Sequence, residues 1–582
     1  MSRNDEVAEL LEEFADLLEA TGVEYKPTAY RRAAENVREH PAPVENLAGE
    51  GADAVAGIDR VGDAIASKIV EYFRTGSIEE LTELRADLPV DIEALTAVEG
   101  VGPKTVGTLY EELGVTTLDE LEAAAEAGEI RAIKGFGEKT EANVLDNIPF
   151  AREVGTRTRI GDARPIADAA LSYLTEIDGV ANVEVCGSIR RWKDTIGDVD
   201  VLVASEDRER IVGAFTDWPA ADATIEAGTG KASVRTDGVR VDLRIVDVAE
   251  FGAALQYFTG SKAHNIAVRN RAIDRGLKVN EYGVFDVREV DDPDDGQRVG
   301  DRVAGETEAG VYEALDMAWV PPEIREDTGE VAAAANDALP TLVETDEIRG
   351  DLHTHTDWSD GSNTIAEMVE AAVDRGYAFH AVTDHASGPG VFGNTGLDEA
   401  AIAEQAEAVA EVAADAPIEV FHGIEANIDA EGEITTDDAT LAALDIVVAS
   451  PHSALGRPAD EATERLVRAV EHPHVDVLGH PTGRIINSRQ GLAPDFATVA
   501  TAAADAGTAI EVNANPARLD ANGDAVRAAL NAGATIAVNT DAHSPREFDN
   551  VRYGVHTARR GWAERADVLN ARSPEELRAF FE

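Results

Sequence analysis

The sequence predicts a multidomain protein of mixed α+β and α/β class, with a helical N-terminal part, a mixed sheet in the middle and a closed parallel β/α barrel at the C-terminal end. Three observations support this prediction. A glycine motif recurs between residues 58 and 145. Two aspartates stand two residues apart in an apolar strand near residue 200. After Gly350, short apolar segments stop at polar residues and alternate with alanine-rich stretches of helical composition.

The N-terminal part is predicted to consist of helices that bind phosphate groups. Residues 98–113 and 133–145 each carry an apolar-Gly-apolar-Gly pattern before a helix, and residues 58–73 hold a degenerate copy with Arg60 in place of the first glycine. This pattern is typical of helix-hairpin-helix motifs, in which backbone N–H groups at a helix N-terminus bind a phosphate without reading bases. Helix caps in a plain helical bundle are the alternative. The residues expected to contact DNA are Gly100, Gly102, Lys104, Gly135, Gly137 and Lys139.

Three aspartates in the middle of the chain are predicted to hold two divalent ions. Asp198 and Asp200 are two residues apart in an apolar strand, so both carboxylates lie on one face. Asp242 lies in residues 239–246, whose alternating pattern predicts a neighbouring strand. Two ions about 4 Å apart can clamp the attacking hydroxyl and the leaving oxygen in nucleotidyl transfer. By itself, an Asp-x-Asp pair more often lies in a turn or a solvated edge than in a metal site. The assignment of a metal site therefore depends on the surrounding residues.

Those surrounding residues favour a triphosphate site. Gly187 and Ser188 precede the aspartates by about ten residues and permit close backbone approach to a triphosphate. Arg191 can neutralise the phosphate charge. The sequence therefore predicts a nucleotidyl-transfer site in this sheet.

The C-terminal part is predicted to bind metal ions through imidazole and carboxylate groups. Eleven of the 13 histidines lie after Gly350, and nine donors sit at or near strand ends. Such donors suit Zn²⁺, Mn²⁺ or Fe²⁺, and the lack of cysteine in this half excludes a thiolate zinc site. Nine donors are too many for one ion and suit two or three. The donors are His353, His355, Asp360, His385, Glu425, His452, His480, Asp541 and His543. The histidines outside the pattern, expected to be solvated or to support the ligands, are His380, His422, His472, His474 and His556.

Residues 348–582 resemble a PHP (polymerase and histidinol phosphatase) domain, whose pattern of nine ligands is filled completely. The resemblance implies a distorted seven-stranded barrel that binds up to three metal ions and hydrolyses phosphoesters. Small-molecule phosphatases share this fold, so the substrate has to be inferred from the rest of the chain.

Residues 257–285 resemble the thumb of family X DNA polymerases, and residues 305–326 resemble the end of that family's polymerase core. The resemblance implies that Tyr257, Phe258 and Gly260 line the sugar of the incoming nucleotide. It also implies that Asn265 and Arg269 contact the minor-groove side of the new base pair. Lys262 departs from the acidic residue common in animal members, which leaves the details of base stacking open. The full substrate-binding set is Gly187, Ser188, Arg191, Gly197, Tyr257, Phe258, Gly260, Asn265 and Arg269.

Residues 24–41 and 58–84 resemble the small N-terminal domain of the same family, which in some members removes 5′-deoxyribose phosphate through a Schiff-base lysine. The resemblance places Lys68 at the nucleophile and Lys26 near the 5′-phosphate. Schiff-base chemistry needs a neutral amine, which we expect from a depressed pKa. An ordinary surface lysine is the alternative.

The net charge of −61 at first argues against nucleic-acid binding, which usually relies on basic surfaces. The acidity is spread along the chain, however, and only nine lysines stand beside 42 arginines. This composition is typical of proteins adapted to multimolar salt. Already at 1 M salt the Debye length is about 3 Å, so surface charge hardly acts beyond contact. We therefore expect that the protein comes from a halophile and that its acidic side chains keep the protein surface solvated.

The compartment is predicted to be reducing and cytoplasmic. The chain has one cysteine, Cys186, and therefore no disulfide of its own. Its first 22 residues form an acidic amphipathic pattern without signal-peptide features, and no apolar run is long enough for a membrane span.

Together the motifs and these resemblances imply a DNA-directed DNA polymerase of family X for gap filling in DNA repair, with Mg²⁺ or Mn²⁺ at Asp198, Asp200 and Asp242. Two or three Mn²⁺ or Zn²⁺ ions in the barrel would support a 3′-5′ exonuclease or another DNA-end phosphoesterase. The expected partners are gapped or nicked duplex DNA and dNTPs, with no membrane, and we expect a monomer. Two alternatives stay open: a DNA-end binding scaffold with hydrolase activity only, and a small-molecule phosphatase with an appended nucleotidyltransferase. The predicted segments are a lyase-like helical domain (1–84), a helix-hairpin-helix domain (92–150), a palm (155–250), a thumb (251–326), a linker (327–347) and the PHP domain (348–582).

Overall fold

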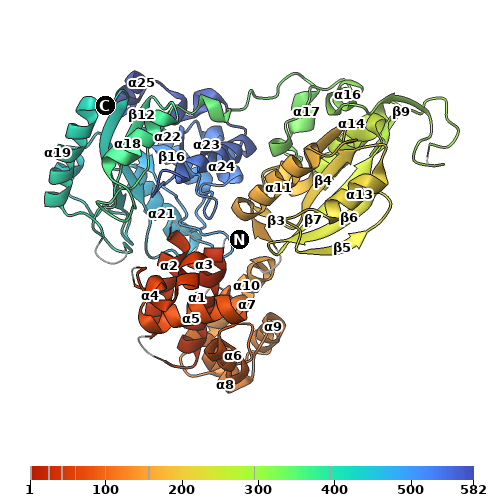
Figure 1. The fold of residues 1–582 in the computed structure, drawn as a ribbon. Helices are drawn as coiled ribbons and strands as arrows, with labels where there is room; N and C mark the ends of the chain where they lie inside the picture. Colours follow the sequence, from red (N-terminus) through yellow and green to blue (C-terminus); the bar gives the residue numbers. More distant parts are fainter. Residues whose placement is uncertain are drawn as a thin grey trace. The chain divides into compact units, whose positions relative to one another are not determined.

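The computed structural model describes residues 3–581 except 24–25, 41–43, 59, 99, 155–156, 294 and 392–394. The chain divides into two compact units (Figure 1). The first contains residues 1–157 and 487–489, and the second contains residues 158–486 and 490–582. No helix among the described residues is long and apolar enough to cross a membrane.

The first unit is helical, as predicted, and none of its described residues forms a strand. Its α-helices are α1 (Arg3–Ala20), α2 (Lys26–Glu39), α3 (Val44–Glu50), α4 (Ala52–Val55), α5 (Asp63–Thr75), α6 (Glu79–Asp87), α7 (Ile92–Thr96), α8 (Pro103–Leu113), α9 (Leu118–Glu126) and α10 (Glu138–Val154). One cluster of buried apolar residues extends from Val7 to Ala151. The two predicted N-terminal segments therefore share a continuous core.

Glycines mark the ends of the hairpin helices. Gly102 is the N-cap of α8, and Pro103 follows at the first helical position, where its missing N–H costs no hydrogen bond. Gly114 ends the same helix in the left-handed conformation, with φ of 69°. The glycine pattern therefore fixes the limits of this helix.

The second unit begins with a mixed five-stranded sheet in the order β2-β4-β7-β6-β5. Its strands are β2 (Asn182–Val185), β4 (Val199–Ala204), β5 (Ala223–Ala227), β6 (Lys231–Thr236) and β7 (Val239–Val246). β4 and β7 run parallel, and the other neighbouring pairs are antiparallel. The odd-numbered apolar residues of β4 and β7 pack with α11 (Ile160–Thr175) and α13 (Arg208–Thr216). Leu202 and Ala204 pack on the opposite face with α14 (Phe251–Thr259).

The segment predicted as the thumb, residues 251–326, begins with α14. It contains α15 (Lys262–Asp274), a three-stranded antiparallel sheet and α16 (Glu308–Glu313). The strands of this sheet are β8 (Leu277–Asn280), β9 (Gly283–Asp286) and β10 (Asp301–Ala304). The segment expected as a linker forms α17 (Glu330–Ala334), and its apolar residues Val331, Ala334, Leu339 and Leu342 pack against the thumb core. Residues 327–347 are therefore a packed connection.

The C-terminal part is the predicted seven-stranded parallel barrel, with strands in sequence order. The strands are β11 (Gly350–Asp351), β12 (Phe379–Val382), β13 (Glu419–Asn427), β14 (Ile446–Ser450), β15 (Val477–Leu478), β16 (Ala509–Asn513) and β17 (Ile536–Asn539). The helices are α18 (Ile365–Asp374), α19 (Glu399–Asp415), α20 (Asp438–Leu441), α21 (Ala459–Val470), α22 (Phe496–Ala506), α23 (Gly523–Ala532), α24 (Val551–Arg560) and α25 (Pro574–Phe581), most of them around the strands (Figure 1). Leu352 N donates to Asn539 Oδ1, and Thr354 forms a parallel bridge with Ala542. These contacts join the two ends of the sheet and nearly close the barrel.

Candidate metal centres

The nine predicted barrel ligands lie at or beyond the C-terminal ends of the strands. His353 and His355 follow β11, and His385 follows β12. Glu425 lies near the end of β13. Parallel strands bring these ends to one mouth of the barrel, where βα loops supply functional side chains. The remaining ligands, in loops after β11, β14, β15 and β17, are Asp360, His452, His480, Asp541 and His543.

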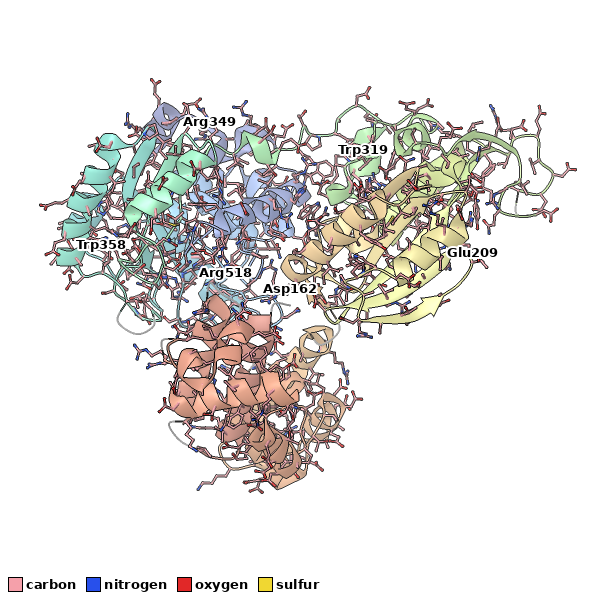
Figure 2. All side chains as sticks on the ribbon, viewed as in Figure 1. Asp162, Glu209, Trp319, Arg349, Trp358 and Arg518 are labelled. Atoms are coloured by element: carbon pink, nitrogen blue, oxygen red, sulfur yellow. The ribbon has the colours of Figure 1, made fainter. Side chains whose placement is uncertain are left out.

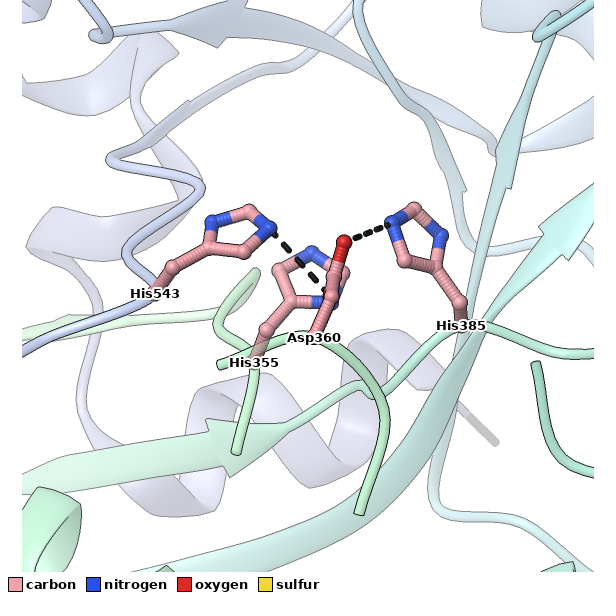
Figure 3. A group of neighbouring side chains, drawn as sticks. All are labelled: His355, Asp360, His385 and His543. Atoms are coloured by element: carbon pink, nitrogen blue, oxygen red, sulfur yellow. Dashed lines mark ion pairs between the residues drawn. The ribbon is translucent and has the colours of Figure 1, made fainter. Parts of the chain in front are cut away.

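Seven of these residues form three overlapping groups. Within each group, one ligand atom per residue lies within 4.8 Å of all the others. Figure 3 shows the first group, in which two histidine rings reach the carboxylate of Asp360. The groups are His355, Asp360, His385 and His543; His353, His355 and Glu425; and His385, Glu425 and His452. His355, His385 and Glu425 each belong to two groups, so the structure offers adjacent ion positions with shared ligands.

The last two predicted ligands join the same cluster. His480 Nε2 lies 2.8 Å from Glu425 Oε1. Asp541 Oδ1 lies 3.0 Å from His355 Nε2. The structure therefore brings together all nine residues that the sequence singled out, and Glu425 lies fully buried among them.

The donor atoms lie close together but lack the geometry of hydrogen bonds to one another, as is expected of metal ligands. Both carboxylate oxygens of Glu425 are buried without a hydrogen-bond partner, and so are His353 Nε2, both ring nitrogens of His355 and His452 Nε2. Several pairs are nevertheless close, such as His385 Nδ1 and Glu425 Oε2 at 2.6 Å. Buried polar groups normally find partners, so close atoms without hydrogen-bond geometry indicate ligands aimed at a shared cation.

Electrostatics keep the carboxylates ionised. Burial by itself would raise the pKa of Glu425, but His452, His385 and His353 hold it well below its usual range. Burial would likewise raise the pKa of Asp541, and His353 is the strongest of the groups that lower it. Metal ligands must be deprotonated, so these carboxylates are in the form that binds cations.

Neutral imidazole is also available in the cluster. Burial lowers the pKa of His452 to about 4. Burial also lowers the pKa of His355, and the neighbouring His543 and His385 lower it further. Both rings are therefore neutral near pH 7 and have a lone pair for a metal ion.

A second layer of polar side chains holds the ligands, and sequence analysis did not single it out. Glu511 in β16 lies 2.7 Å by Oε1 from His353 Nδ1 and accepts a hydrogen bond from the backbone N–H of His480. Asn427 Oδ1 lies 2.7 Å from His452 Nδ1. Such partners fix the ring orientation and tautomer of a ligating histidine. A charged residue within the apolar strand 509–513 was the available signal for Glu511.

The histidines outside the ligand pattern take other partners. His380 is buried and lies 3.3 Å by Nε2 from Thr354 Oγ1, and burial lowers its pKa to about 4. His422 Nε2 lies 3.3 Å from Gln405 Oε1. His556 Nδ1 lies 2.8 Å from Glu323 Oε1.

The palm aspartates also form one cluster. Asp198, Asp200 and Asp242 place carboxylate oxygens within 4.8 Å of one another. Asp200 and Asp242 are direct partners on the parallel strands β4 and β7. Burial raises the pKa of Asp200 to about 7, and the negative charges of Asp198 and Asp242 add to the shift. Three crowded carboxylates fit divalent cations, whose charge relieves this repulsion.

The predicted triphosphate residues lie beside this cluster. Gly187 begins the short helix α12 (Gly187–Arg190) with φ of 64°, and a Cβ there would lie 2.6 Å from Asp200 Oδ2. Gly197 is exposed next to Asp198. Arg191 has partners within the protein: its guanidinium donates to Thr259 O and, through Nε, to Glu326 Oε1 at 3.1 Å. It would have to exchange these partners to reach a phosphate.

The predicted sugar and base contacts lie on α14, α15 and the turn between them. Tyr257 is 42% exposed and meets Phe258 edge to face, with ring centroids 5.2 Å apart. A Cβ at Gly260 would lie 3.2 Å from Arg191 Nη1, which joins this turn to the triphosphate residues. Asn265 accepts from Gln256 Nε2 and donates to Tyr257 O. Arg269 and Lys262 are exposed on α15.

In the first unit, the hairpin glycines have the backbone shape expected of phosphate-binding turns. Gly100 and Gly135 have φ of 86° and 101°. Gly102 and Gly137 immediately precede α8 and α10, and Lys104 and Lys139 are exposed in the first turn of those helices. Glu99 and Asp59, within two of the motifs, lie outside the described residues. Lys26 is exposed at the start of α2.

Lys68 lies in α5, and its Nζ is 2.6 Å from Glu80 Oε2 and 5.5 Å from the ring centre of Phe14. Burial by itself would lower its pKa, but Glu80 and Tyr30 raise it above the ordinary value. The expected depressed pKa is therefore wrong for this state of the protein, because the lysine has gained an acidic partner.

Comparison with known proteins agrees with this arrangement. Family models match a helix-hairpin-helix domain at residues 2–78, a SAM-like helix-hairpin-helix tandem at 92–148, a DNA polymerase beta thumb at 254–326 and a PHP domain at 351–515. The rat DNA polymerase lambda is 26% identical over 304 residues, which cover 48% of this chain and 49% of the relative. A probable phosphatase of Caldanaerobacter subterraneus is 32% identical over 210 residues, which cover 33% of this chain and 75% of the relative.

One relative matches the polymerase segments and the PHP segment together over nearly its full length. The DNA polymerase/3′-5′ exonuclease PolX of Bacillus subtilis is 33% identical over 580 residues, which cover 99% of this chain and 98% of the relative. The match includes the helical unit, the palm, the thumb and the barrel in one alignment. The chain therefore belongs to the PolX family, the family X DNA polymerases that carry a PHP domain.

Proposed function

We propose that this protein is a DNA-directed DNA polymerase that fills gaps during repair and also hydrolyses DNA from the 3′ end in its PHP domain. The observation that carries the proposal is that one chain holds two separate ligand clusters of different chemistry. Three carboxylates meet on parallel palm strands, and nine imidazole and carboxylate groups meet at the barrel mouth. The relative from Bacillus subtilis, similar over the whole chain, is named for both activities.

In the palm, Asp198, Asp200 and Asp242 hold the divalent ions, for which we propose Mg²⁺ or Mn²⁺. When bound, these ions supply charge neutralisation at the attacking 3′-hydroxyl and at the leaving pyrophosphate. Gly187 and Ser188 leave space for the triphosphate next to Asp200. The aromatic pair Tyr257 and Phe258 lines the sugar, while Asn265 and Arg269 contact the new base pair.

In the barrel, the nine ligands hold two or three ions, for which we propose Mn²⁺ or Zn²⁺. When bound, these ions supply a hydroxide nucleophile and stabilise charge on the attacked phosphate. Glu511 and Asn427 fix the rings of His353 and His452, so that these ligands keep their orientation as the substrate binds. Arg518, labelled in Figure 2, lies 3.6 Å by Nε from Asp541 Oδ2 and adds positive charge beside the cluster.

The test is incubation of the protein with gapped and 3′-recessed DNA in high KCl, with each divalent metal and with or without dNTPs. The proposal expects template-directed extension with dNTPs and shortening from the 3′ end without them. A DNA-end scaffold would bind DNA and only hydrolyse it. A small-molecule phosphatase, which the relative from Caldanaerobacter keeps as a second candidate, would release phosphate from simple phosphomonoesters and leave DNA intact.

We further propose that the protein is a cytoplasmic monomer from a halophile. Its net charge of −61 is spread along the whole chain. Folding and gap filling should therefore persist or improve as KCl rises to about 2 M, because salt screens the repulsion between acidic side chains. This trend is opposite to the usual loss of DNA binding with salt. Circular dichroism and extension rates across a KCl series measure it, and an optimum at 0.1 M would contradict the halophilic interpretation.

For the N-terminal domain we propose 5′-deoxyribose-phosphate lyase activity, with Lys68 as the nucleophile and Lys26 at the 5′-phosphate. Glu80 keeps the Lys68 amine charged in the free protein, so the abasic DNA must displace this partner before attack. Borohydride should trap a covalent adduct with 5′-deoxyribose-phosphate DNA, and Lys68→Ala should lose most of it. Glu80→Gln should trap faster at neutral pH because it removes the acidic partner. Trapping that is absent, or that survives Lys68→Ala undiminished, would leave this domain with phosphate binding alone.

A further inference from the structure

The turn that follows the triphosphate helix α12 is held by side chains of the barrel. Trp192 in this turn stacks on His556 of α24, with ring centroids 3.6 Å apart and ring planes 8° apart. Tyr553 of the same helix meets the Trp192 ring edge to face at 5.9 Å. The Arg164 guanidinium from palm helix α11 lies 4.8 Å from its centre. The Trp192 indole therefore packs against side chains of both the barrel and the palm.

Both ends of the turn have further barrel contacts. Arg560 Nη1, at the end of α24, donates to the carbonyl oxygen of Arg191 at 3.1 Å. Arg484 Nη2 donates to Asp194 Oδ2 at 2.8 Å. The backbone of residues 191–194 is therefore fixed from the barrel on both sides of Trp192.

The contact between barrel and palm is closely packed. Ile486, Leu519 and Tyr553 from the barrel belong to the buried core of the palm. A Cβ at Gly161, in the first turn of α11, would lie 2.5 Å from Pro516 Cβ, which only glycine permits. Side chains at a closely packed interface have little room to move. A shift of a barrel residue is therefore passed on to the palm residues that it contacts.

The backbone conformation of Trp192 requires these contacts. Its φ of 52° lies in the left-handed region, which bulky side chains rarely adopt. A residue keeps such a conformation only where its surroundings impose it. In this turn the imposing groups include His556, which is itself fixed by Glu323 through Nδ1 at 2.8 Å.

The turn also determines where the triphosphate residues lie. Lys193 N donates to Ser188 O at 3.1 Å, and Arg191 N donates to Gly187 O at 3.3 Å. Arg191 itself is the first residue of the turn. A shift of Trp192 would therefore move both the backbone and the guanidinium proposed to meet the nucleotide.

We propose that helix α24 of the PHP barrel positions the nucleotide-binding turn of the polymerase, with His556 as a positioning residue that acts through Trp192. The inference rests on the proposed polymerase function and adds to it that the barrel contributes to dNTP binding. α24 closely follows the loop that carries Asp541 and His543, so one segment supports both centres. The partners of His556 among the described residues include Trp192 and Glu323, neither of which is a proposed ligand, so His556 acts on the nucleotide through the turn.

The test compares His556→Ala and His556→Phe with the unchanged protein. His556→Ala removes the stacked ring and is expected to raise the dNTP KM in gap filling about tenfold, the size of a strong aromatic contact. Because the chemistry is untouched, kcat should change much less, and 3′-end hydrolysis should be unchanged. His556→Phe keeps a flat ring on Trp192 and should restore the KM. His472→Ala, a histidine elsewhere on the barrel, is the matched control.

Direct titration of the Mg²⁺–dNTP complex into protein with gapped DNA gives the dissociation constant independently of catalysis. The inference expects it to rise in His556→Ala together with the KM. An unchanged dissociation constant would overturn the inference, and so would equal losses of polymerisation and hydrolysis together with a lower melting temperature. A Phe variant as weak as the Ala variant would also overturn it. If the unchanged protein binds dNTPs but never extends a primer, the proposed function fails, while the dissociation constants still decide the positioning role.

Discussion

Asp200→Asn is expected to abolish nucleotide incorporation while hydrolysis of DNA ends continues. Asp200 clusters with Asp198 and Asp242, and a neutral amide in its place would weaken the binding of the proposed divalent ions. Loss of metal-based charge stabilisation costs several kcal/mol in the transition state, or more than about a thousandfold in rate. The asparagine retains the shape of the side chain next to Gly187. Single-turnover extension of gapped DNA measures the loss, and 3′-end shortening of the same substrate measures the retained activity.

Glu209→Gln is the matched control, because this exposed carboxylate lies on α13, which packs on the face of the sheet opposite to the aspartates. It should leave both activities unchanged. His355→Ala is the reciprocal variant, and it should stop hydrolysis and leave extension intact. If either Asp200→Asn or His355→Ala removed both activities in a folded protein, the two centres would not be independent.

Glu425→Gln is expected to abolish 3′-end hydrolysis and to reduce the number of ions bound per chain. Glu425 belongs to two of the three ligand groups, and its Oε1 is also 2.8 Å from His480 Nε2. It is fully buried, so the amide would introduce a neutral group where histidines and cations need a negative charge. Metal analysis of the purified protein counts the ions, and calorimetric titration with Mn²⁺ gives their affinity.

Glu419→Gln serves as the control for this variant. Glu419 begins the same strand, β13, at the opposite end of the barrel and pairs with Arg578. It should keep the full number of ions and the full rate of hydrolysis. Retention of all ions and of hydrolysis in Glu425→Gln would show that this residue is not a shared ligand, and the proposed arrangement of ions would be wrong.

The residues predicted as ligands cluster in space as expected, because both groups follow from the periodicity and direction of strands. In extended backbone, a spacing of two residues places Asp198 and Asp200 on one face. In the barrel, repeated strand–ligand–helix units bring ligands from distant positions to the same mouth, because all strands run in one direction. The seven-stranded parallel order confirms this prediction.

Local pattern could not predict the partners of charged side chains. The sequence indicated Lys68 and Arg191 by their positions in motifs. Their chemistry depends on Glu80 and Glu326, which lie 12 and 135 residues away along the chain. The acidic, alanine-rich composition of residues 327–347 likewise indicated a linker, but its apolar residues pack against the thumb.

By itself, the sequence determined the class of each part, the ends of α8 through Gly102, Pro103 and Gly114, and the nine barrel residues and three palm aspartates that cluster as candidate ligands. These features depend on residue type and on spacing within one strand, turn or helix. Tertiary structure alone decided that Glu511 supports His353, that Glu80 keeps Lys68 charged and that His556 stacks on Trp192. Each of these contacts joins residues from different elements, and their distance in space depends on how those elements pack, which no local pattern of residues encodes.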